Sequence, residues 1–195
     1  MKYNKQEIME EQIIKKFSFK DMLNNAHRYG LVMGGVMIVI GMLYYVFEVN
    51  MFSIGFSIIG SLVNISIIII TMVMSTKNYR IKYMDGKINY GKCMLNCWIT
   101  AFVALLISGI FSFLFYYLFD PAYMPAQIEK FREMMETKLP EEKLDEIINR
   151  MMDGLSPLKQ LQSTLISSIV FSGIVALITS IFIKKKDDTF ESNFQ

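Results

Sequence analysis

The chain of 195 residues has little of what most enzymes and disulfide-stabilised proteins use: one histidine, two cysteines and four prolines. Two cysteines cannot build a disulfide scaffold, and 53% apolar residues with only 11 glycines exclude a disordered or collagen-like chain. No phosphate-binding loop, zinc-protease motif, C-x-x-C pair or dinucleotide-binding glycine motif is present. Charge is also missing locally, since Asp, Glu, Lys and Arg are absent from 29–47, 49–76, 93–119 and 160–183. Such long uncharged runs exclude an ordinary soluble domain.

Each uncharged run is long enough, or nearly so, to cross a hydrocarbon core, which takes about 20 helical residues. A backbone in lipid must satisfy its own hydrogen bonds, so these runs are expected to be helices despite their many β-branched residues. The sequence therefore predicts an all-α polytopic membrane protein with four transmembrane helices. The predicted spans are about 29–48, 52–76, 93–119 and 160–183.

Lysine and arginine predict the orientation of the chain. Six Lys or Arg residues precede the first span, five lie in the 77–92 loop and three, Lys184 to Lys186, follow the last span. The segment 120–159 also contains six Lys or Arg, but these are outnumbered by nine Asp or Glu. Short basic loops stay in the cytoplasm. We therefore expect both termini to be cytoplasmic and 120–159 to lie on the other side of the membrane.

The predicted domain organisation is a cytoplasmic amphipathic segment over 1–27, a four-helix membrane domain over 28–186 and a cytoplasmic tail over 187–195. Residues 5–17 fit either an amphipathic helix at the interface or a solvated tail. A new helix is predicted to begin after Ser18, because Asp21 stands at the third position of a capping pattern.

The extracytoplasmic segment 120–159 is predicted to be a helical hairpin. Pro125 suits the first turn of a helix that ends near Lys138, and Pro140 suits a second that ends before Gly154. An apolar stripe on the second helix needs a cover, which is the other helix, the membrane surface or a partner protein. Its residues are candidate partner contacts: Leu144, Ile147, Ile148, Met151 and Met152.

Small residues recur every four positions in the spans, which allows helix backbones to approach closely in lipid. Serine stripes can also line a polar pore, but packing is the favoured interpretation. Asn64 lies near the middle of the second span and is expected to hydrogen-bond another helix. The other candidate packing residues are Gly30, Gly34, Ser57, Ser61, Ala104, Ser108, Ser112, Ser168, Ser172 and Ala176.

Apart from Glu48 at the end of the first, the spans hold no Asp, Glu, His, Lys or Arg, which disfavours ion-coupled transport and intramembrane hydrolysis. No catalytic residue and no cofactor is therefore predicted. Cys93, Cys97 and His27 would lie at one membrane depth, but a fourth metal ligand is missing, so buried thiols are favoured over a metal site. Nucleic-acid binding is not expected, because the clusters of Lys and Arg are short and are already accounted for by the orientation of the chain in the membrane.

Several short motifs occur in a fixed order: Tyr79-Arg80, Gly86-Lys87-Ile88-Asn89-Tyr90-Gly91, Asp120-Pro121 after the third span and Ser156-Pro157 before the fourth. With these motifs, residues 25–186 resemble a family of small bacterial membrane proteins with four helices, catalogued as a domain of unknown function. The resemblance implies a location in the bacterial cytoplasmic membrane and no particular activity.

The hypothesis that follows is a non-catalytic accessory or scaffold protein that acts through helix packing and the external hairpin. Its expected partners are the lipid bilayer and either a second copy or another membrane protein. The alternative is a small permease or channel lined by the serine stripes.

Overall fold

The computed structural model describes residues 18–184, and these form an all-helical structure, as the sequence predicted. Four helices are long and apolar enough to cross a membrane, and they coincide with the four predicted spans. In chain order the elements are α2 (Phe19–Val46), α3 (Ile54–Tyr83), α4 (Tyr90–Leu114), the π-helical turn η1 (Phe115–Phe119), α5 (Tyr123–Met135), α6 (Glu141–Gly154) and α7 (Pro157–Ile183).

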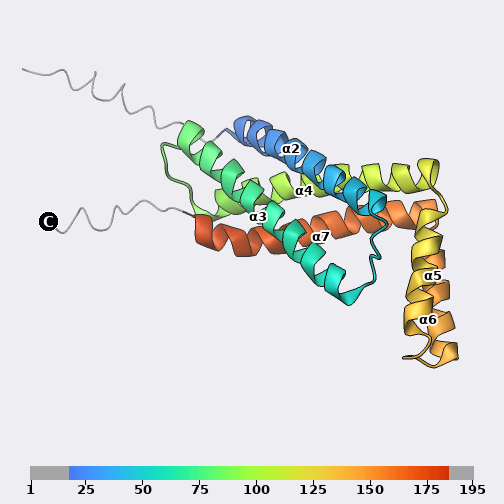
Figure 1. Ribbon diagram of the computed structural model, residues 1–195. Helices are drawn as coiled ribbons and strands as arrows, with labels where there is room; N and C mark the ends of the chain where they lie inside the picture. Colours follow the sequence, from blue (N-terminus) through green and yellow to red (C-terminus); the bar gives the residue numbers. More distant parts are fainter. Residues whose placement is uncertain (1–17, 185–195) are drawn as a thin grey trace, which may run out of the picture.

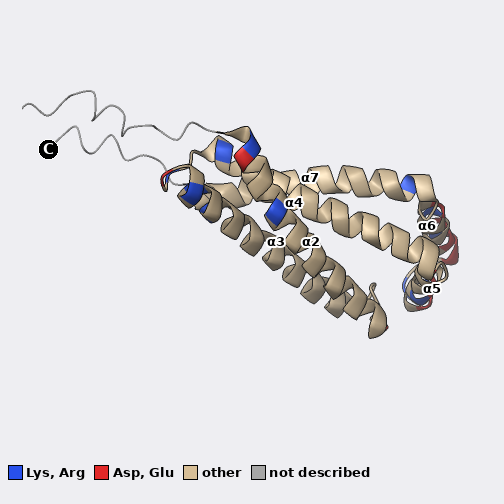
Figure 2. Ribbon diagram, turned by 90° about the horizontal axis from the view of Figure 1, so that it is seen from above, with Lys and Arg blue, Asp and Glu red and all other residues tan. Residues whose placement is uncertain are grey.

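The helix α4 occupies the centre of the bundle and packs against α2, α7 and α3. Helices α4 and α7 run side by side, whereas α2 and α3 cross them at an angle (Figure 1). Residues 18 and 184 lie at the same end of the bundle as the α3–α4 loop, which we call the basic end. Helices α5 and α6 lie across the opposite end, which we call the hairpin end (Figure 1). Charged residues are found near these two ends, while the middle of each long helix carries none (Figure 2).

Local sequence signals set where the helices begin. The Ser18 hydroxyl accepts a hydrogen bond from the Asp21 backbone N–H at 3.3 Å, as the capping pattern predicted. The Asn89 side chain caps α4 by accepting from the Lys92 N–H at 3.0 Å, and Pro157 occupies the start of α7 after Ser156. In the loop before α4, Gly86 has φ +82°, a conformation that glycine adopts without strain.

The predicted division between residues 27 and 28 lies within α2, which is continuous from Phe19 to Val46, and it stays a prediction. Two predicted helix ends need correction. In the hairpin, α5 ends at Met135 rather than near Lys138, and α6 includes Gly154. The predicted segments 1–17 and 187–195 lie outside the described residues.

Two glycines bring α2 and α4 into close contact. A Cβ atom on Gly30 would lie 2.8 Å from both the Thr100 carbonyl oxygen and Val103 Cβ, and one on Gly34 would lie 3.2 Å from the Ala104 carbonyl oxygen. Neither position has room for a larger side chain without moving α4. This close approach gives the van der Waals contact that holds helices together in lipid.

We expect Gly30→Ala to lower the free energy of unfolding by about 1–3 kcal/mol, because the new methyl group overlaps backbone that cannot rotate away. Gly35→Ala is the matched control, since its added methyl group meets no atom within 4 Å. Thermal or denaturant unfolding in lipid-like micelles measures both variants. Equal stability of the two would show that α2 and α4 do not pack at Gly30.

Candidate functional site

A buried cluster of polar side chains joins α2, α3 and α4 near the basic end, and we call it the polar cluster: Asn25, Ser75, Thr76, Asn96 and Thr100. All five residues are buried. The Asn96 amide donates to the hydroxyls of Ser75 and Thr76, both at 3.0 Å. The Asn25 amide donates to the Ser75 carbonyl oxygen at 2.9 Å and to Asn96 Oδ1 at 3.4 Å. Three helices are therefore linked by hydrogen bonds with no water required.

The remaining hydrogen-bonding groups of the polar cluster find partners within the protein. Asn78 donates to Asn25 Oδ1 at 2.7 Å. Thr100 donates to the Asn96 carbonyl oxygen of its own helix at 2.7 Å and lies 3.0 Å from the Ser75 hydroxyl. A network whose groups are paired with one another fixes helix positions and does not require a polar ligand.

Asn64 does not make the interhelical bond that the sequence predicted. Its amide donates to the Gly60 carbonyl oxygen of the same helix at 2.8 Å, and the side chain is only half-buried. The bonds between helices come instead from Asn25 and Asn96, nearer the basic end. One signal pointed there: Asn25 lies just before the first predicted span, Ser75 near the end of the second and Asn96 near the start of the third, so all three are expected at a similar depth.

The small residues of α4 and α7 lie within helix contacts. Ser168, Ser172 and Ala176 of α7 are buried, as is Ala104 of α4, while Ser108 and Ser112 are half-buried. The Ser108 and Ser172 hydroxyls donate to carbonyl oxygens of their own helices, at 3.2 and 3.1 Å. These hydroxyls are thus already paired, which favours packing over a polar pore on these two helices.

The serines of α3 lie in a different setting. Ser57 and Ser61 are exposed and line, with Asn64, a cavity of about 470 Å³ that opens at the side of the bundle. We call this cavity the lateral groove. It is lined by residues of all four long helices and the α2–α3 loop: Met37, Tyr44, Met51, Phe56, Ser57, Gly60, Ser61, Asn64, Ile65, Ile68, Leu105 and Phe171.

The two hairpin helices cover each other's apolar stripes. Ile128 of α5 and Leu144 and Ile148 of α6 form a small buried core, with other apolar side chains packed around it, among them Met151. Leu144 and Ile148 therefore cannot contact a partner while the hairpin is closed. Of the predicted contact residues, Ile147 and Met152 remain accessible, with 36% and 45% of their surface exposed.

The hairpin is attached to the bundle by contacts of three kinds. The Tyr45 hydroxyl of α2 donates to Asp120 Oδ2 at 2.9 Å. The backbone N–H of Met51 donates to the buried Gln127 amide oxygen at 3.3 Å. The rings of Phe52 and Phe131 lie 5.1 Å apart. The α2–α3 loop and the end of α2 together fix how α5 lies across the bundle.

Tyr123 opens α5 and packs between the bundle and the hairpin. Its ring stacks on Tyr116 with centroids 5.2 Å apart. Burial raises the pKa of the Tyr123 phenol, and the nearby carboxylates of Asp120 and Glu48 raise the pKa further. The phenol therefore stays neutral at physiological pH and serves as part of the packed joint.

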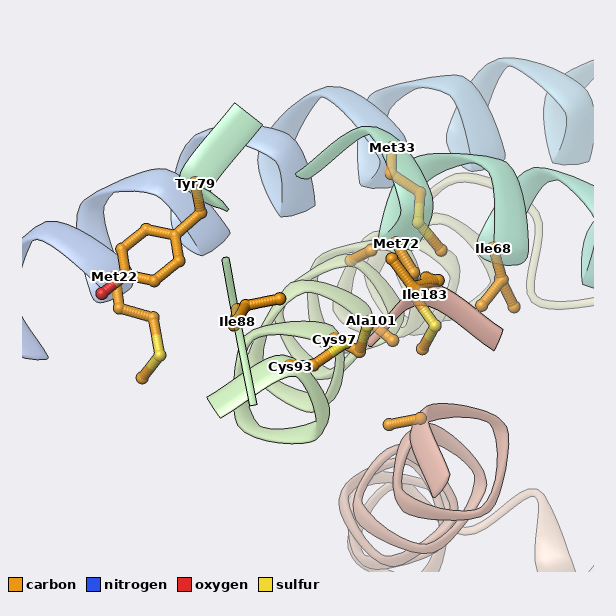
Figure 3. Close-up of a cluster of buried hydrophobic side chains, with 12 residues drawn as sticks. Met22, Met33, Ile68, Met72, Tyr79, Ile88, Cys93, Cys97, Ala101 and Ile183 are labelled. Atoms are coloured by element: carbon orange, nitrogen blue, oxygen red, sulfur yellow. The ribbon is translucent and has the colours of Figure 1, made fainter. Parts of the chain in front are cut away.

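The two cysteines belong to the apolar core of the bundle. Cys93 and Cys97 are buried on α4 among residues such as Met72 and Ala101 (Figure 3), whereas His27 is exposed on α2. Between residues 18 and 184, no three His, Cys, Asp or Glu side chains are grouped so that they could hold a metal ion.

The family described as "Protein of unknown function (DUF4199)" matches residues 28–185, which is most of the chain. The chain belongs to this family. The resemblance seen in the sequence motifs is thereby confirmed, and DUF4199 membership by itself assigns no activity. No curated protein and no solved structure matches the chain.

The residues that carried the DUF4199 resemblance occupy contacts that hold helix ends in place. The Tyr79 hydroxyl donates to the Ser18 carbonyl oxygen at 3.4 Å, and Arg80 donates to the Ile183 carbonyl oxygen at 3.4 Å. The Tyr90 hydroxyl donates to the Leu177 carbonyl oxygen at 3.3 Å. Together with Asp120, these residues connect segments far apart in the chain, so the motifs specify an arrangement of helices.

We expect Asn96→Ala to reduce the free energy of unfolding by about 1–3 kcal/mol, because it removes the two buried hydrogen bonds to Ser75 and Thr76 and the acceptor of the Asn25 amide. Asn64→Ala is the matched control, since its bond lies within one helix, and its cost should be within about 0.5 kcal/mol. Chemical denaturation in micelles measures the difference. A cost for Asn64→Ala as large as that for Asn96→Ala would contradict the assigned role of the polar cluster.

Proposed function

We propose that this protein is a non-catalytic component of the bacterial cytoplasmic membrane that assembles with a second copy or another membrane protein through its hairpin. The observation that carries the proposal is the closed and anchored hairpin. Because α5 and α6 cover each other's apolar stripes and are tied to α2 and the α2–α3 loop, they present a preformed surface. A preformed surface binds without the cost of ordering a loop.

The polar groups inside the bundle support a role in assembly over one in catalysis. Those of the polar cluster are hydrogen-bonded to one another, and the hydroxyls of Ser108 and Ser172 bond their own helices. Catalysis would require a nucleophile, base or ligand directed at a substrate. The apolar side chains left accessible beside the hairpin core, Ile147 and Met152, are suited to contact a partner.

The proposed orientation places both termini and the α3–α4 loop in the cytoplasm and the hairpin outside. It rests on the five Lys and Arg residues of 77–92 and the three lysines that follow the last span, against the acidic excess of 120–159. The fold supports this by grouping residues 18 and 184 with the α3–α4 loop at one end and the hairpin at the other (Figure 1).

Single-cysteine labelling tests this orientation. A membrane-impermeant maleimide added to intact spheroplasts should label Glu142→Cys on α6, whereas Lys87→Cys in the α3–α4 loop should react only after the membrane is opened. The native Cys93 and Cys97 are buried, so the background should be low. Labelling of Lys87→Cys from outside, with Glu142→Cys protected, would reverse the proposed topology.

Association through the hairpin is tested by crosslinking in native membranes. Replacing the accessible Ile147 and Met152 by glutamate should reduce the yield of crosslinked complex about tenfold, equivalent to about 1.4 kcal/mol. Asn149→Glu is the control, since it adds a charge to the same helix without removing an apolar contact. An unchanged yield in the double variant, with the hairpin still folded, would refute hairpin-mediated assembly.

A small permease or channel remains the second candidate, favoured by one observation: Ser57, Ser61 and Asn64 line the lateral groove. Solute flux through vesicles that contain the purified protein, lowered by Ser61→Leu, would support this candidate. Ser61 suits the experiment because it is exposed, so the substitution leaves the buried helix contacts intact.

A further inference from the structure

The lateral groove extends over one half of the membrane. Along α3 its lining runs from Phe56 to Ile68, which is about 18 Å of helix at 1.5 Å per residue. The hydrocarbon core of a bilayer is about 30 Å thick, so the groove covers roughly one leaflet. Met51, in the loop at the hairpin end, lines the outer part of the groove. The leaflet in question is therefore the one next to the hairpin.

The groove closes near the middle of the bundle because α3 is held against α4 from there to the basic end. Ile68 and Met72 are buried, and one turn further Ser75 and Thr76 bond Asn96. A transmembrane helix must cross both leaflets, and it would leave the groove halfway along its length. A lipid acyl chain ends at the midplane, where the groove ends.

The surface of the groove also suits a hydrocarbon chain. Met37, Phe56, Leu105 and Phe171 contribute apolar side chains from four different segments. The Ser57 hydroxyl donates to the Met51 carbonyl oxygen at 2.9 Å, and the Asn64 amide donates to Gly60. The Ser57 hydroxyl and the Asn64 amide are thus bonded to nearby backbone, so the occupant does not have to satisfy these two donors. At about 470 Å³, the cavity falls in the size range of small-molecule sites.

We propose that the lateral groove binds one acyl chain of a glycerophospholipid, with the glycerol near Met51 and the chain terminus near Leu105 and Phe171. The lipid comes from the leaflet next to the hairpin. This inference goes beyond assembly through the hairpin, and either proposal can fail without the other.

Photoreactive phospholipid in detergent-free phosphatidylethanolamine vesicles tests the site on the unaltered protein. With a diazirine at the chain terminus, crosslinks should map to Leu105 and Phe171 at the closed end of the groove. With a diazirine near the glycerol, they should map to Met51 and Ser57. Labelling whose position does not change with that of the diazirine would overturn the proposal.

A matched pair of variants tests whether the chain lies in the groove or only against the outside of α3. Ser61→Phe places a ring inside the groove and should reduce labelling of Leu105 and Phe171 several-fold. Leu62→Phe adds a ring to the neighbouring residue, which is 61% exposed and does not line the groove, and it should leave labelling unchanged. Equal labelling in the two variants would refute the site.

Discussion

Helices surrounded by lipid gain nothing from hiding apolar surface, because acyl chains are as apolar as leucine. The bundle therefore depends on close backbone approach and on buried hydrogen bonds, and α4 supplies both. The Gly30 backbone approaches it at Thr100 and Val103, and Asn96 of α4 bonds α2 and α3. Many large apolar side chains of the long helices are exposed instead. The buried interior accordingly combines small and polar residues, such as Ala104 and Thr100, with a few larger apolar ones, such as Met72.

The two ends of the bundle differ because these contacts are unevenly distributed. Near the basic end the polar cluster holds α3 close to α2 and α4. Toward the hairpin end, α3 has no comparable bonds to its neighbours in the described residues, since Asn64 bonds within its own helix. Helix α3 crosses α7 at an angle (Figure 1). The lateral groove is lined by α3 residues from Phe56 to Ile68 and by Phe171 of α7. The position of a few asparagines along the chain thus determines where the bundle is closed and where it is open.

The sequence was sufficient for those features that depend on local chemistry. Uncharged runs gave the four long helices, and Ser18 and Ser156-Pro157 marked where two of them begin. It was insufficient for features that depend on which helix faces which. Spacing places Ser57, Ser61 and Asn64 on one face, but the same spacing fits a packed face or an open groove. The apolar stripe of α6 likewise did not indicate which of its three potential covers it uses, and α5 proved to be the cover.

The lateral groove and the hairpin share one short connection, the α2–α3 loop. Met51 lines the groove with its side chain while its backbone N–H bonds Gln127 of α5, and the next residue, Phe52, packs on Phe131. Gln127 is buried, so its amide oxygen cannot exchange this partner for water without opening the joint. A shift of the loop at the groove must therefore move α5 or break that bond. The lateral groove and the hairpin are in this way parts of one mechanically connected unit.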